Sequence, residues 1–126
     1  MALNWTIDSR LRTVDIIAEG DVSAADAMAF FDAIEGAEAL PYNKLLDCTH
    51  GSSAMTPEDL MSIVARIRAQ HGLSVMGALA VVATPEQAQL LARLLGAAAV
   101  ADRPLKVFEE LRLARRWLGA QPRRQS

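Results

Sequence analysis

Apolar residues in this chain follow two spacings, which together predict the order of strands and helices. Two N-terminal segments, residues 3–9 and 10–20, carry the alternating or short apolar runs of β-strands. They directly follow one another, so we predict an antiparallel hairpin, which ends at Gly20-Asp21. Further strands are predicted at residues 44–48, 78–83 and 105–109.

Four other segments have the three-and-four spacing of amphipathic helices. Ser23, Thr56 and Thr84 precede the first three and are suited to cap them, and Pro follows both threonines. The fourth helix is expected over residues 109–119. The faces expected to be buried are Ala27, Phe30, Phe31 and Ile34; Leu60, Ile63, Val64 and Ile67; Leu91, Leu94 and Leu95; and Leu111, Ala114 and Leu118.

The elements therefore follow the order ββαβαβαβα. Strands that alternate with helices predict a mostly parallel sheet with right-handed crossovers. The hairpin adds an antiparallel strand, which usually lies at an edge of the sheet. The predicted fold class is α/β: a single domain with a mostly parallel central sheet of about five strands, an N-terminal antiparallel hairpin and four helices.

Length and composition fit a cytoplasmic protein. The chain has 126 residues, so we assign residues 1–120 to a single domain and residues 121–126 to a flexible basic tail. One cysteine, Cys48, excludes an intramolecular disulfide. The N-terminus lacks the basic start and apolar run of a secretory signal. The longest nearly apolar stretch, residues 73–83, is too short to span a bilayer.

Charge is distributed unevenly along the sequence. The formal net charge is -2, which argues against a nucleic-acid partner. Residues 1–63 hold 11 acidic and 3 basic residues, whereas residues 64–126 hold 4 acidic and 10 basic residues. Solvated helix faces account for this division, and an electrostatic dipole that orients a partner is the alternative.

Polar residues gather in the segment from Leu45 to Leu60, LLDCTHGSSAMTPEDL, where a strand leads into a helix. In open α/β sheets, ligands bind outside the carboxyl ends of the parallel strands. We therefore predict a ligand or partner loop there, formed by Asp47, His50, Gly51 and, after the next strand, Thr84.

The same segment contains incomplete versions of several sites. Ser52 and Ser53 lack the glycine elbow and an arranged base that a nucleophile requires. Cys48 and His50 form half of a metal site, without the third ligand that zinc needs. Thr56 suits a helix cap, and a phosphate there would meet a favourable helix dipole but also two acidic neighbours. We therefore expect no catalytic residue, metal or cofactor.

The whole pattern resembles the SpoIIAA-like group of STAS-domain proteins, particularly their bacterial STAS/SEC14-like branch. The resemblance is carried by the hairpin, by LLDCTHGSSAMTPEDLMSI, by the strand ALAVVA and by the closing motif KVFEELRLARRWLG. It covers nearly the whole chain and consists mostly of core positions. The resemblance implies an anti-sigma-factor-antagonist type of module, which binds a partner kinase and is switched by phosphorylation of Ser or Thr.

Matching Asp47 to the strand-end Asp of that family brings Thr56 to about the phospho-acceptor position. Here Met55-Thr56-Pro57-Glu58 stands where the family has an Asp-Ser-Ser-Gly segment. Thr56 is thus the first candidate phospho-acceptor, and Ser52 and Ser53 are the others.

Two function classes follow. The first is a non-enzymatic binding or regulatory module that docks a protein partner or a second copy of itself as a homodimer. The second is a small carrier or sensor of an apolar, lipid-like molecule, to which the SEC14-like side of the resemblance points. A contiguous apolar cavity would favour the carrier, whereas a close-packed interior would exclude it. An enzyme is a distant third.

Overall fold

The computed structural model describes residues 2–98 and 103–123, without the side chains of Leu90 and of residues 93–98. The described residues form five strands and four helices in the order predicted from the sequence. These are β1 (Leu3–Asp8), β2 (Thr13–Asp21), α1 (Ala24–Gly36), β3 (Asn43–Ser52), α2 (Pro57–Leu73), β4 (Leu79–Val82), α3 (Pro85–Ala98), β5 (Leu105–Phe108) and α4 (Leu111–Gly119).

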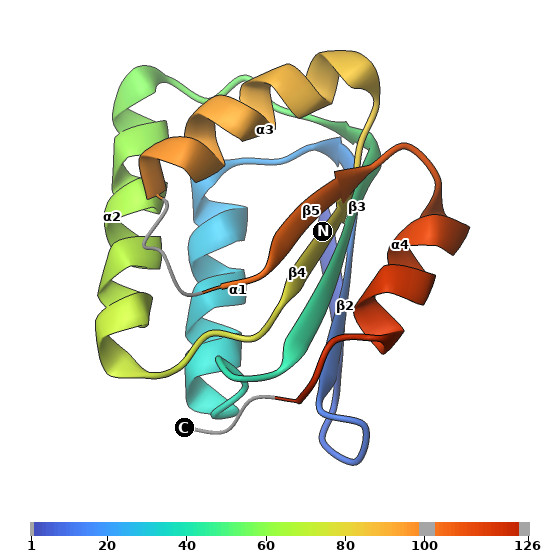
Figure 1. The fold of residues 1–126 in the computed structure, drawn as a ribbon. Helices are drawn as coiled ribbons and strands as arrows, with labels where there is room; N and C mark the ends of the chain where they lie inside the picture. The colour runs from blue at the N-terminus through green and yellow to red at the C-terminus, as the bar shows by residue number, and fades with distance from the viewer. Residues whose placement is uncertain (1, 99–102, 124–126) are drawn as a thin grey trace.

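The strands form one sheet in the order β1-β2-β3-β4-β5. β1 and β2 are antiparallel, and every later pair is parallel. Helices α1, α2 and α3 lie on one face of the sheet and α4 lies on the other (Figure 1). The predicted fold class, an α/β domain with an N-terminal hairpin at the sheet edge, is confirmed.

Local sequence explains where the first two helices begin. Ser23 accepts a hydrogen bond from the backbone N–H of Asp26, whose carboxylate accepts one from the backbone N–H of Ser23. Thr56 and Asp59 form the same reciprocal pair at the start of α2. Such capping boxes satisfy backbone donors that the first turn leaves unpaired. Both predicted caps are therefore confirmed.

The predicted end of the third strand is wrong. The sequence placed a loop directly after Cys48, but β3 continues to Ser52 and pairs with the long strand β2. The register shifts where Ile17 pairs with Asp47 and Glu19 pairs with His50, so β3 has an extra residue there. A bulge of this kind lets a strand of mixed polarity stay in the sheet. Asp47, His50 and Gly51 are therefore strand residues.

The core has two sides. On one side α4 packs on β3, β4 and β5, with Ala114 and Leu118 buried against Ala80 and Val82. Leu111, expected on the same face, is 38% exposed. On the other side α1 packs over the hairpin, whereas α2 lies mainly against α1 and α3. The side chains of Leu94 and Leu95 lie outside the described residues.

Gly77 connects this core to the turn before β3. Its N–H donates to the carbonyl of Leu40 at 3.0 Å. A Cβ at this position would lie 2.0 Å from the carbonyl oxygen of Tyr42, which is a backbone atom and has little freedom to move. Only glycine allows the two backbone segments to approach this closely.

We therefore expect Gly77→Ala to lower the free energy of unfolding by about 3 kcal/mol, because backbone must shift to admit the methyl group. Gly72→Ala is the matched control, since a Cβ there meets nothing within 4 Å and α2 should gain stability from the better helix former. Urea unfolding of both variants checks this. Equal stability of the two variants would contradict the proposed close approach.

Candidate functional site

A cavity of about 290 Å³ lies between the sheet and helices α1, α2 and α3. Side chains from the sheet and from all three of these helices line it, and most of them are apolar. Sheet residues form one wall and helix residues the other. The lining includes Ile16, Ala18, Leu46 and Val81 from the sheet, and Phe30, Ile34, Leu60, Ile63, Ile67 and Leu91 from the helices.

The placement of α2 explains this space. The apolar stripe of α2 was expected to be core, yet only Ile63 in it is buried, and Leu60, Val64 and Ile67 are half-buried. Because α2 packs mainly on α1 and α3, Leu60, Ile63 and Ile67 face the cavity and not the sheet. The stripe thus lines the cavity as well as contributing to the fold.

The volume of the cavity can be compared with the volumes of known ligand sites. Small-molecule sites begin at about 300 Å³ and are mostly apolar with a few polar groups. This volume and lining match such a site.

Lys44 supplies the main polar group of the lining. It lies at the start of β3, is only 3% exposed, and donates from Nζ to the carbonyls of Leu40 at 2.7 Å and Tyr42 at 2.9 Å. Burial lowers the pKa of Lys44 well below its usual 10.5, and the charge of Arg103 lowers this pKa further. Arg103 also lines the cavity and donates from Nε to the carbonyl of Gly77 at 2.7 Å.

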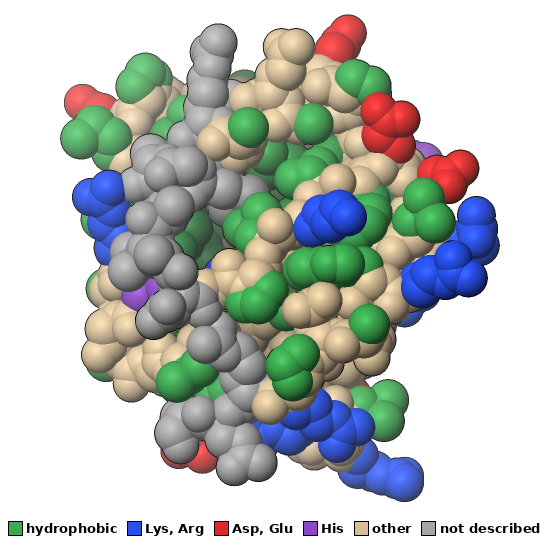
Figure 2. All heavy atoms as spheres, in the orientation of Figure 1, with side chains coloured by type: hydrophobic (Ala, Val, Ile, Leu, Met, Phe, Trp, Pro, Cys, Tyr) green, Lys and Arg blue, Asp and Glu red, His purple; other side chains and the backbone are tan. Residues whose placement is uncertain are grey.

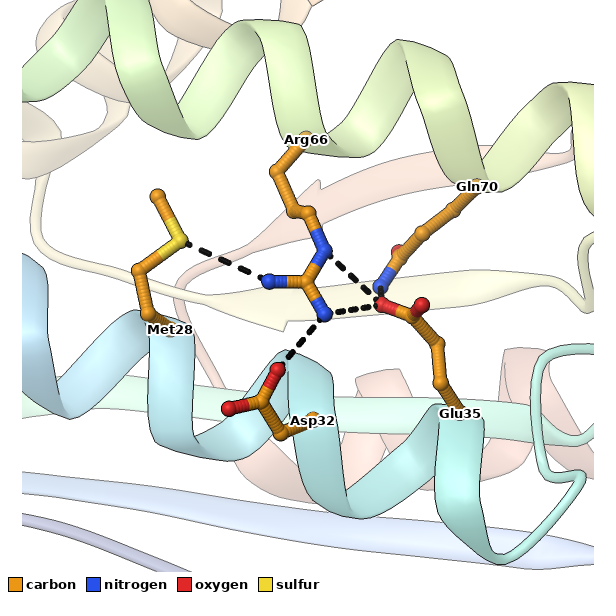
Figure 3. A network of polar contacts seen from close by, with 5 residues as sticks. All are labelled: Met28, Asp32, Glu35, Arg66 and Gln70. Carbon is orange, nitrogen blue, oxygen red and sulfur yellow. Dashed lines mark hydrogen bonds and ion pairs between the residues drawn. The ribbon is translucent and has the colours of Figure 1, made fainter.

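A polar network fixes α2 to α1 beside the cavity (Figure 3). Arg66 donates to Glu35 at 2.9 Å and to Asp32 at 2.7 Å, and Gln70 donates to the same carboxylate oxygen of Glu35 at 2.9 Å. The hydrogen bonds to Asp32 and Glu35 raise the pKa of Arg66. Gln70 is 1% exposed, so this network reaches from the surface to the cavity wall.

Gln87 connects α3 to the far end of β3. Its side-chain nitrogen donates to the carbonyls of Cys48 at 2.7 Å and Gly51 at 3.0 Å. Its side-chain oxygen accepts from the N–H of Thr84, while its own N–H donates to the Thr84 hydroxyl. Gln87 was missed in the sequence, although its place three residues after a capping threonine was a signal for it.

The predicted ligand loop is only partly assembled at the cavity. Gly51 is part of the lining, and Thr84 caps α3 and is joined to Gly51 through Gln87. Asp47 instead accepts from the N–H and the hydroxyl of Thr49 at 3.0 and 2.7 Å, which stabilises the bulge. His50 is exposed and is not among the lining residues.

The candidate phospho-acceptors lie near this end of the cavity. Ser52 and Ser53 are exposed and also line the cavity, which therefore reaches the surface beside them. Ser53 donates to the carbonyl of Val22 at 3.3 Å and accepts from the N–H of Met55. Thr56 is exposed, and its hydroxyl accepts from the N–H of Asp59. Phosphorylation of any of the three stays a prediction.

Cys48 lines the cavity as a thiol. Burial, with the nearby charge of Asp47, raises the pKa of Cys48 to about 11. At neutral pH the reactive thiolate is therefore scarcely populated.

Within residues 2–98 and 103–123, no three His, Cys, Asp or Glu side chains gather as they would around a metal ion.

The arginines of α4 form a separate surface feature. Arg112, Arg115 and Arg116 are all exposed, and Figure 2 shows basic side chains along the edge of the molecule where α4 lies. Trp117 packs on the core beside Phe108, with ring centroids 5.8 Å apart. These arginines lie on the opposite face of the sheet from the cavity.

None of the helices in the described part of the chain is long and apolar enough to cross a membrane.

The lowered pKa of Lys44 gives a test of its burial. Between the folded pKa and the unfolded value near 10.5, the unfolded chain binds more protons, so the free energy of unfolding rises with pH. Relative to Lys44→Met, we expect this rise in the wild type and in Lys106→Met, because the opposing effect of the raised pKa of Cys48 above about pH 9 is common to all three proteins. Urea unfolding at steps from about pH 7 to about pH 10 measures it. Identical pH profiles for all three proteins would contradict a buried, uncompensated Lys44.

Comparison with known proteins agrees with this fold. A solved structure, an uncharacterized protein from the DUF3478 family with a SpoIIAA-like fold from Shewanella loihica PV-4, matches with a TM-score of 0.66. The match covers 93% of this chain and 94% of that chain at 18% sequence identity, so it shows the fold alone. Among curated protein sequences, none matches.

A family model described as SpoIIAA-like matches residues 13–119, which is most of the chain. The resemblance inferred from the sequence is thereby confirmed, and this protein belongs to the SpoIIAA-like family.

Proposed function

We propose that this protein is a non-enzymatic module that carries or senses a small apolar molecule, held in the cavity beneath α2. The single observation that supports this most strongly is the cavity itself: about 290 Å³, contiguous, and lined almost entirely by apolar side chains. A close-packed interior would have excluded this function, and a regulatory module that only docks a protein has no need of such a space.

The architecture around the cavity supports the proposal. α2 can act as a cover because it is attached to α1 by side-chain polar contacts, chiefly those of Arg66, and makes few contacts with the sheet. A cover of this kind can yield to an entering molecule at less cost than a helix packed directly on strands. The exposed serines beside the cavity mark a path from the surface to its interior.

Protein docking and phospho-regulation at Thr56, Ser52 or Ser53 remain predictions from the resemblance. The capping box adds a carboxylate, that of Asp59, directly beside the Thr56 hydroxyl. A phosphate on Thr56 would replace the hydrogen bond that the Thr56 hydroxyl accepts from the N–H of Asp59 with a repulsion between the phosphate and the Asp59 carboxylate. The geometry at Thr56 therefore favours the structural role, and the cavity is the stronger basis for a function.

We expect Ile67→Trp to abolish binding of a neutral apolar probe, 1-decanol, because the indole occupies the cavity. Met61→Trp is the matched control: it makes a similar change on the same helix, at a side chain that is 72% exposed. Thermal unfolding with and without 1-decanol measures binding. At a hundredfold excess over its Kd, the probe should raise the Tm of the wild type and of Met61→Trp by roughly 8 °C.

The same variant tests whether the space is unfilled. Because the indole enters existing volume, we expect Ile67→Trp to unfold without ligand at a Tm equal to or above that of the wild type. An equal shift by 1-decanol in all three proteins would place the probe on the surface. No shift in the wild type would remove the basis of the proposed function.

A further inference from the structure

Lys44 is out of place in an apolar cavity. Residues alternate between the two faces of β3, and Lys44 shares its face with Leu46 and Cys48, which also line the cavity. Its side chain is almost completely buried, at 3% exposure. A charged side chain is rarely buried to this degree unless it is paired.

Among the residues that the structure describes, no carboxylate compensates the charge of Lys44. An ammonium group has three N–H donors, and two of them are accounted for by the carbonyls of Leu40 and Tyr42. The ionisable residues among the described lining are Lys44, Cys48 and Arg103, so no carboxylate faces the cavity there. The nearby guanidinium of Arg103 adds charge of the same sign.

A purely structural role does not account for this arrangement. The two carbonyls need hydrogen-bond donors, which an uncharged side chain supplies without the cost of burying a charge. An anion in the cavity would provide the missing counter-charge and accept the third N–H of Lys44. A buried charge without its partner destabilises a protein far more than a site in which no ion pair was ever buried. An empty site of this kind therefore favours the binding of an anion.

We propose that the ligand is an amphiphile with an apolar tail and a single carboxylate head group, and that Lys44 binds the carboxylate within the cavity. This proposal rests on the proposed function and specifies its ligand class. The size of the tail follows from the volume. A cavity of about 150 Å³ holds benzene, which has six heavy atoms. By the same proportion, the cavity here has room for roughly twelve heavy atoms. Carboxylic acids of about eight to ten carbons, which have ten to twelve heavy atoms, therefore fit.

The test compares decanoate with 1-decanol, which differ in the charge of the head group. In calorimetric titrations of the wild type, we expect decanoate to bind roughly tenfold tighter or more, as a charge-assisted hydrogen bond provides. Lys44→Met should lose this preference, with decanoate weakened about tenfold and 1-decanol little changed. Lys106→Met, which removes an exposed lysine on β5, should keep it.

The outcomes separate the two proposals. If neither compound binds the wild type, the proposed function fails and this inference with it. If both bind equally, or if Lys44→Met keeps the preference for decanoate, the cavity binds apolar molecules but Lys44 does not select an anion. Either of these last results overturns the inference and leaves the proposed function in place.

A second measurement needs no variant, in case Lys44→Met does not fold. The carboxyl carbon of ¹³C-labelled decanoate reports its ionisation by NMR during a pH titration. Beside Lys44, the bound acid should stay ionised to a lower pH than the free acid. A bound acid that becomes protonated at a higher pH than the free acid would show an apolar environment without a cation, and would overturn the inference.

Discussion

The position of α2 decides the character of this domain. The helix is fixed to α1 by a guanidinium that binds two carboxylates, and it packs mainly on other helices and not on the sheet. If Arg66, Asp32 and Glu35 were apolar, α2 could close onto the strands and fill the space with its own side chains. The ion pairs instead hold the middle of α2 against α1, where all three side chains remain partly exposed. The apolar volume beneath α2 depends on that spacing.

Features that stabilise the fold are therefore separate from features that suggest function. α4 and the opposite side of the sheet form a compact core around Ala80 and Ala114, both of which are fully buried. The cavity side, in contrast, contains an open apolar cavity and a buried lysine, each of which lowers stability. Natural proteins keep such costs mainly where a site needs them. The contrast between the two faces of one sheet is the basis for placing the proposed site on the cavity side.

Much of the fold could be predicted because it follows from local rules. Capping residues such as Ser23 and Thr56 and the spacing of Phe30 and Ile34 gave the helices, and their alternation with strands gave the parallel sheet. The end of β3 was missed because Thr49 to Ser52 are polar, small or turn-forming residues, which local propensity assigns to a loop. Pairing with β2 overrides that propensity, as tertiary context often does in strands.

The cavity could not be predicted, because an apolar stripe has the same sequence whether it meets a neighbour or an empty volume. The half-burial of Leu60 and Ile67 is a property of the packing alone. Lys44 did leave a signal: it is a charge on the same strand face as Leu46 and Cys48. In the sequence it is only the first residue of a predicted strand. Its deep burial, at 3% exposure, is visible only in the structure.

The proposed function requires the space beneath α2 to receive an apolar ligand. Isotope-filtered NMR tests this most directly, through nuclear Overhauser effects between bound decanoate and assigned methyl groups of the protein. We expect contacts from the alkyl tail to Ile34, Ile63, Ile67 and Met76, which converge on the cavity from α1, α2 and the segment before β4. Contacts confined to exposed side chains such as Leu111 and Leu113 on α4, with none to these four, would contradict it.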